Sequence, residues 1–160
     1  MALSVLFNNL QSLEGGASGA GPTGPQTAGA TLKVSPHRTI IRGHVPERTS
    51  QLITLVLTDD SNEDIPLDAL TALTLSLYLV GSATYINGRN KQNILNANGV
   101  TVAQTTAKIL TINYPMDPLD NQVVGSGVTE QHVALVEWTL NGKEDKHEIL
   151  LRVLNLENVP

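Results

Sequence analysis

Strict alternation of apolar and polar side chains over residues 73–79 is the feature that most limits how this chain can fold. Leucine occupies every second position from 73 to 79, and Thr74, Ser76 and Tyr78 stand between the leucines. Successive side chains of a β-strand point to opposite faces of a sheet, so a period of two predicts a strand with one buried face. We therefore expect a half-buried β-strand here.

The same period of two recurs elsewhere. The apolar positions are Ile53, Leu55 and Leu57, then Leu110, Ile112 and Tyr114, then Ala134, Val136, Trp138 and Leu140. Together these segments predict at least four antiparallel strands. Weaker strand candidates are residues 31–34, 39–42, 100–103 and 148–154. Short strands at close spacing, with little helix between them, predict an all-β, immunoglobulin-like antiparallel β-sandwich.

Turn-forming residues divide the strands. Asn141-Gly142 follows Leu140 and favours a hairpin, which predicts that residues 133–140 pair with residues 147–154. Residues 143–146 are interpreted as a loop that lengthens this turn. The polar stretch 81–97 is expected to be an exposed loop with Tyr85 and Ile86 as its only bulky groups. Trp138, the only tryptophan, is expected to anchor the core between the two sheets.

The N-terminal part of the chain has a different composition. Residues 14–31 contain no large apolar side chain and are rich in Gly, Ala, Pro and Thr, which indicates a linker or arm. We therefore predict an N-terminal arm and linker over residues 1–31 and a β-sandwich domain over 32–160. A short apolar cluster begins the arm and supplies the candidate partner-docking residues: Leu3, Val5, Leu6, Phe7, Leu10 and Leu13. Two outcomes stay open, namely that the cluster docks on a partner, or that it folds back on its own domain or stays disordered.

Charge and cysteine content exclude several classes of partner and chemistry. The net charge of -5 provides no positive field to gather phosphates, so nucleic acid is not expected as a partner. Zero cysteines exclude a thiolate nucleophile, a disulfide framework and a zinc-thiolate site. No stretch approaches the roughly 18 apolar residues of a membrane span, and the first residues lack a signal peptide's pattern. We expect a soluble protein that is made and used without secretion.

A glycine motif in the linker resembles a phosphate-binding loop only in its spacing. Gly19, Gly21 and Gly24 match G-x-G-x-x-G, but no strand precedes them. Pro22 and Pro25 also oppose the helix that must follow in a dinucleotide site. The two Gly-Pro triplets are likewise too few for a collagen helix. We interpret the segment as linker.

Metal ligation has two weak signals. The acidic stretch 59–64 offers oxygens at calcium-loop spacing from Asp60, yet Ile65 and Thr71 stand where an EF-hand needs glycine and glutamate. We interpret it as a solvated turn, and a weak ion site there stays open. The histidines never form a metal-binding pair, and we expect surface or strand-edge positions for His37, His44, His132 and His147. No catalytic, cofactor or metal residue is predicted, and no cofactor and no enzyme activity are expected.

The run from residue 52 to 79 also carries a family resemblance. It contains Thr58-Asp59-Asp60, then Ile65-Pro66-Leu67-Asp68, then Leu70 and the alternating strand. With the segments 99–100, 108–114 and 133–153, it resembles the immunoglobulin-like β-sandwich of tailed-phage baseplate upper proteins over roughly residues 38–156. The chain departs from the family where Asn62-Glu63-Asp64 replaces a turn with glycine before the proline, and in the length of segment 81–97.

The resemblance implies a function. A member of that family would be a non-enzymatic structural component of a bacteriophage virion, in the tail or baseplate, connecting the hub to the fibres. Its partners would be other virion proteins and copies of itself, assembled in the host cytoplasm. A capsid decoration protein is an alternative, since both need a rigid β-module with a docking segment. A carbohydrate-binding module or small hydrolase is a third, although one Trp, three Tyr and one Phe supply few aromatic platforms.

Overall fold

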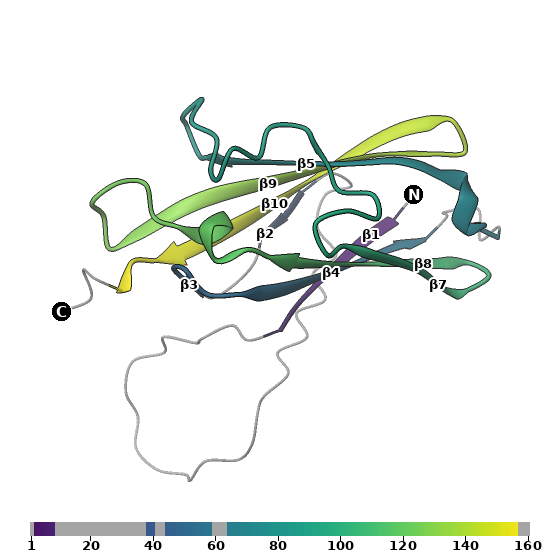
Figure 1. Cartoon of the computed structure of the whole chain (residues 1–160), viewed down its shortest axis with the longest axis horizontal. Coiled ribbons are helices and arrows are strands. Elements are labelled where there is room, and N and C mark those ends of the chain that lie inside the picture. The colour runs from purple at the N-terminus through teal and green to yellow at the C-terminus, as the bar shows by residue number, and fades with distance from the viewer. Residues whose placement is uncertain (1, 9–37, 41–43, 59–63, 157–160) are drawn as a thin grey trace, which may run out of the picture.

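The computed structural model describes residues 2–8, 38–40, 44–58 and 64–156, which form two packed β-sheets (Figure 1). The first sheet has the order β1-β4-β8-β7, with all pairs antiparallel. Its strands are β1 (Ala2–Asn8), β4 (Gln51–Thr58), β7 (Thr101–Thr106) and β8 (Ile109–Met116).

The second sheet has the order β2-β10-β9-β5-β6, and β3 also pairs with β10. Its strands are β2 (Arg38–Ile40), β3 (Val45–Pro46), β5 (Leu70–Leu79), β6 (Gln92–Asn93), β9 (Thr129–Leu140) and β10 (Lys143–Leu154). Strands β2 and β3 run parallel to β10, whereas the other pairs are antiparallel. Two short 3-10 helices, η1 (Leu67–Ala69) and η2 (Pro118–Asn121), lie between strands. The predicted all-β sandwich with mainly antiparallel strands is confirmed.

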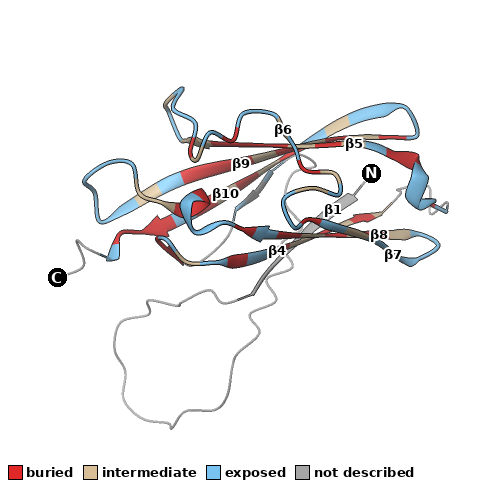
Figure 2. Ribbon diagram, in the orientation of Figure 1, coloured by how far each residue is buried: buried red, intermediate tan, exposed pale blue. Residues whose placement is uncertain are grey.

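The core lies between the sheets, where the alternating positions meet (Figure 2). Leu73, Leu75 and Leu77 of β5 are at most 1% exposed, and the same holds for Leu55 and Leu57 of β4. Trp138 belongs to this cluster and is 4% exposed, as predicted for a core anchor. The period of two in the sequence therefore marks the face of each strand that packs inward.

Strands β9 and β10 form the predicted hairpin. Their register runs without interruption from Leu140↔Lys143 to Thr129↔Leu154. Asn141 and Gly142 alone make the turn, with φ values of 51° and 72°. The expectation of a longer loop over residues 143–146 is wrong, because a turn with two positive φ angles matches the strand twist and lets pairing resume at once.

Residues 81–97 form an ordered segment along the edge of β5, which corrects the expectation of an exposed loop. The N–H groups of Ile86 and Ile94 donate to Leu77 O and Leu73 O, both at 2.9 Å. Both isoleucines are 1% exposed and belong to the core. The segment satisfies backbone groups that β5 would leave unpaired, and its isoleucines fill the side of the sandwich.

The N-terminal residues 2–8 take one of the outcomes left open above, in which they fold back on their own domain. They form β1, which pairs with β4 from Ala2↔Thr58 to Asn8↔Leu52. Leu3, Val5, Leu6 and Phe7 therefore lie on a sheet strand and not on an arm outside the sandwich. Leu10, Leu13 and the rest of the linker through residue 31 lie outside the described residues, and so does the strand candidate 31–34.

Strand pairing explains this placement. Without β1, strand β4 would present a row of unpaired backbone N–H and C=O groups at the edge of its sheet. The composition of residues 14–31 predicts a linker between residues 2–8 and the domain. It does not predict which sheet edge residues 2–8 pair with. In the described ranges, no helix is long and apolar enough to cross a membrane.

Candidate functional site

A buried carboxylate, Asp120, lies at the centre of a polar cluster in the core. It is in η2, between β8 and β9, and is 0% exposed. It accepts hydrogen bonds from Asn87 Nδ2 at 2.8 Å, from Arg89 Nε at 2.7 Å and Nη2 at 3.1 Å, and from the Tyr114 hydroxyl. The backbone N–H of Asp117 donates to it at 3.0 Å. We call these residues the Asp120 cluster.

The electrostatics of the Asp120 cluster suit a structural role. Burial alone would raise the pKa of Asp120, but hydrogen bonds from Arg89, Tyr114 and Asn87 outweigh it, and the net pKa lies below the usual value. Burial, reinforced by the carboxylate, raises the pKa of Tyr114. The cluster thus holds a fixed ion pair and a neutral phenol, enclosed away from solvent. It ties segment 81–97 to the connection between β8 and β9.

A second buried polar group is the pair His132–Glu130 at the start of β9. His132 is 0% exposed, and its Nε2 lies 3.0 Å from Glu130 Oε2. Glu130 also accepts hydrogen bonds from the backbone N–H groups of Val124, at 2.9 Å, and Gly125. Burial lowers the pKa of His132, and Glu130 offsets this only in part, so the imidazole is neutral at pH 7.

The other histidines and the acidic stretch do not assemble into a metal site. The predicted surface or strand-edge position is wrong for His132 and for His147, which is 3% exposed within β10. Both point into the core because they share the inward period of their strands. His37, residues 59–63 and the glycine motif lie outside the described residues, and Asp64 is exposed. Within the described ranges, no three His, Asp or Glu side chains are arranged to hold a metal ion.

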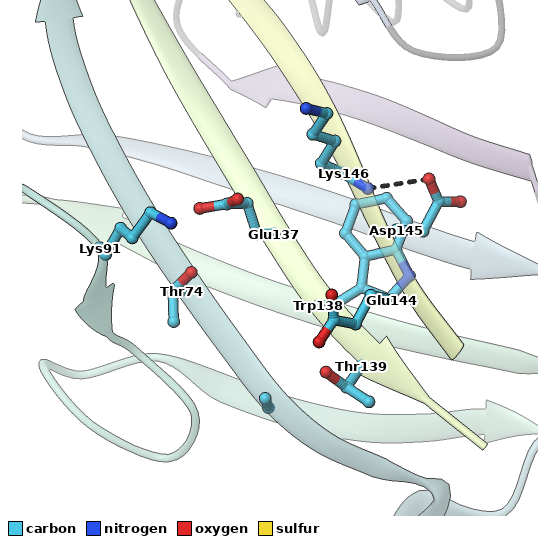
Figure 3. A pocket seen from close by; sticks show the side chains of 9 residues that line it. Thr74, Lys91, Glu137, Trp138, Thr139, Glu144, Asp145 and Lys146 are labelled. Atoms are coloured by element: carbon cyan, nitrogen blue, oxygen red, sulfur yellow. Dashed lines mark hydrogen bonds between the residues drawn. The ribbon is translucent and has the colours of Figure 1, made fainter. Parts of the chain in front are cut away.

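A groove of about 570 Å³ lies over β5, β9 and β10 (Figure 3). The strand register places Thr74, Glu137 and Lys146 in one row across it. Lys91 and Glu144 add charges of both signs to its lining. Trp138 also contributes to the lining but is 4% exposed, so its ring offers no face on which a sugar would stack. We call this feature the outer groove.

The edge formed by β1 and β4 is the remaining candidate, because it contains the predicted docking residues. Leu3, Val5, Leu6 and Phe7 lie on β1, the outermost strand of its sheet. The structure thereby brings these residues to one sheet edge. Residues 3–7 are apolar except for Ser4, and a short apolar run of this length is the sequence signal that favours a strand at this position.

Comparisons with known proteins provide little further guidance. No protein-family model matches the chain, and no curated protein matches it. One solved structure that aligns with it is the collagen-binding subdomain of the Enterococcus faecalis surface protein ACE, at 10% identity and a TM-score of 0.20. The alignment covers 74% of this chain and 94% of that one. Superposition this weak transfers neither a ligand nor a function.

Proposed function

We propose that this chain is a non-enzymatic structural component of a bacteriophage virion, located in the tail or baseplate, where it connects the hub to the fibres. The observation that carries the proposal is the position of β1. This strand pairs with the edge of β4, although residues 9–37 separate it in the sequence from β2, the next strand. A strand delivered to a sheet edge by a separate segment is a means of joining modules by main-chain hydrogen bonds. The resemblance of residues 38–156 to baseplate upper proteins supports the same setting.

The polar groups of the described residues support a structural role over a catalytic one. The carboxylate of Asp120 is enclosed and accepts hydrogen bonds from Asn87, Arg89 and Tyr114, so it has no access to a substrate. The imidazole of His132 is likewise 0% exposed. These groups stabilise connections between strands, and that use suits a rigid module in an assembly.

A capsid decoration protein is the alternative that the same edge strand supports, since it needs the same rigid module and the same attachment. A carbohydrate-binding module finds less support, because the outer groove has a buried Trp138 where a sugar platform would be exposed. Copy number distinguishes a tail protein from a capsid decoration protein. Tail proteins are present in few copies, set by the tail's symmetry, whereas decoration proteins cover the capsid.

The test is quantitative mass spectrometry of density-purified particles, with heads and tails separated. We expect this chain in the tail fraction, at a copy number close to that of other baseplate proteins. A copy number approaching that of the major capsid protein, in the head fraction, would assign the decoration role instead. Absence of the chain from purified particles that contain both heads and tails would refute the proposal.

A further inference from the structure

The connection that leads from β1 to the rest of the sandwich is long compared with the other connections. Residues 9–37 separate Asn8 from Arg38, whereas Asn141-Gly142 suffices between β9 and β10, and Ala107-Lys108 between β7 and β8. A two-residue turn such as Asn141-Gly142 suits pairing of neighbouring strands within one chain. A connection of this length, at most roughly 100 Å when extended, allows β1 to reach a sheet in a neighbouring copy.

We propose that β1 is an exchange strand: β1 of one copy pairs with β4 of a second copy, in the register seen here within one chain. The partner of this edge is thus a second copy of the same protein. The inference deepens the proposed function and rests on it for the setting, a particle that holds copies close together.

The energetics of strand pairing permit such a partner. Pairing from Ala2↔Thr58 to Asn8↔Leu52 uses the same main-chain hydrogen bonds whether the two strands belong to one chain or to two. The choice between them depends on how the concentration of neighbouring copies compares with the effective concentration that the linker imposes, about millimolar for flexible linkers. Copies held side by side in a ring or a lattice raise the local concentration of neighbouring strands and so favour exchange.

The edge at β4 suits exchange better than the opposite edge of the same sheet, β7. Strand β4 pairs with β1 from Leu52 to Thr58 without a register shift. Strand β7 has a register shift between Gln104 and Thr106, and the Gln104 side chain donates to Ile65 O at 2.9 Å. An irregular edge of this kind opposes addition of a further strand, so we assign the exchange to β4.

The absence of cysteine allows a direct test by disulfide trapping in the purified full-length chain. Two populations with tags of different size carry one substitution each, Ser4→Cys in one and Val56→Cys in the other. Ser4 and Val56 are Cα partners in the register, and directly opposed residues lie within the range a disulfide spans. The two populations are mixed, unfolded in urea, refolded together at increasing concentration and oxidised.

We expect a disulfide-linked heterodimer that becomes more abundant as the concentration rises. Asn8→Cys mixed with Leu52→Cys is a second in-register pair, and it protects the test against a variant that fails to fold. The crossed mixtures, Ser4→Cys with Leu52→Cys and Asn8→Cys with Val56→Cys, are the matched controls and should not cross-link. Circular dichroism of each variant verifies folding.

Two results would overturn the exchange. One is the absence of heterodimer from both in-register mixtures while a single chain carrying Ser4→Cys and Val56→Cys closes its own disulfide at every concentration. The other is equal cross-linking of in-register and crossed mixtures, which is random collision. The test uses purified protein alone, so its failure leaves the particle fractionation to decide the proposed function separately.

Discussion

At the scale of single residues, the buried hydrogen bonds of Asp120 are sensitive to substitution. We predict that Asp120→Asn lowers the free energy of unfolding by about 3–5 kcal/mol, because it leaves the guanidinium of Arg89 buried without its counter-charge. The Arg89 side chain is 10% exposed, so water compensates little. Urea unfolding of the wild type and the variant measures the difference.

Two controls separate the lost ion pair from lost packing. Asn87→Ala removes one neutral donor to Asp120 and should cost about 1 kcal/mol. Arg89→Met added to Asp120→Asn should recover part of the loss, because the uncompensated charge is then gone. The contrary result is that Arg89→Met lowers the free energy of unfolding by the same amount in Asp120→Asn as in the wild type. That result would contradict the assignment to a lost ion pair.

His132 makes stability depend on pH. Its pKa in the folded state lies below the ordinary 6.5, so below about pH 6.5 the unfolded chain binds a proton that the native imidazole does not. The free energy of unfolding should therefore fall as pH decreases, by at most about 1.4 kcal/mol per unit, until the native pKa is reached. The lowered pKa of Glu130 affects the free energy of unfolding in a separate pH range, below pH 4.5.

The measurement is urea unfolding at several pH values between about 7.5 and 5.5. His132→Gln removes the titrating group and should flatten the dependence in this window, even if it lowers stability at every pH. The same slope in the variant and the wild type would show that another group causes the dependence.

Trp138 tests the placement of the core. It is 4% exposed between the sheets, and truncation of a buried tryptophan costs about 3–5 kcal/mol. A domain has only about 5–15 kcal/mol in total, so Trp138→Ala should leave the sandwich barely stable, while Trp138→Phe should retain more of the stability. Native tryptophan emission should shift to the red on unfolding. Red emission already in the native state, with an unchanged unfolding midpoint for Trp138→Ala, would contradict the core position.

At the scale of elements, the sequence predicts best what is local. The leucines of β5, and the matching residues of β4, β8 and β9, indicate their strands and inward faces because alternation is a property of neighbouring residues. Asn141-Gly142 likewise predicts the pairing of β9 with β10. Alternation also marks Ile149 and Leu151 as inward positions of β10 once its pairing with β9 is known.

What the sequence does not show is where separate segments meet. Ile86 and Ile94 become core residues only because segment 81–97 follows the edge of β5, and no local pattern specifies that edge. Arg89 and Asp120 are 31 positions apart in the chain, and their pairing depends on that same placement. For the candidate site, the sequence predicts Leu3, Val5 and Phe7 as docking residues but does not predict the strand with which they pair.

The turn between β9 and β10 provides a test at this scale. Gly142 has a φ of 72°, and a Cβ placed there would meet no atom within 4 Å, so only backbone strain opposes a side chain. Gly142→Ala should therefore lower the free energy of unfolding by about 1–2 kcal/mol. Thermal unfolding measures the loss, and Asn141→Gly, which tolerates a positive φ, should show no comparable destabilisation. An unchanged midpoint in Gly142→Ala would mean that the turn adopts another geometry.

At the scale of the whole molecule, the pairing of β1 with β4 affects both the stability of the isolated sandwich and its association with other copies. With β1 in place, β4 is an inner strand of its sheet, and β1 takes the edge position. If β1 leaves, β4 becomes an edge with its full length of backbone groups unpaired. The stability of the isolated chain and its tendency to associate are thus controlled by one terminal strand.

Deletion of residues 2–8 tests this control. We predict a loss of about 2 kcal/mol in the free energy of unfolding, from the lost cross-strand pairs, together with self-association through the uncovered β4 edge. Urea unfolding and sedimentation velocity measure the two effects. A synthetic peptide of residues 2–8 should reverse both by occupying the edge, and a peptide with the same residues in scrambled order should not.

The matched control removes the same length of chain from the linker. Deletion of residues 16–22 removes as many residues as β1 contains and leaves Ala2–Asn8 in place. Loop-closure entropy changes slowly with loop length, so this variant should unfold at nearly the same urea concentration as the wild type and stay dispersed. Equal stability of the two deletion variants, with no association of either, would mean that β1 contributes nothing to the sandwich and that residues 2–8 act as a free arm after all. A loss confined to the 2–8 deletion, reversed by the peptide, would establish β1 as a strand that the domain accepts from outside its own chain.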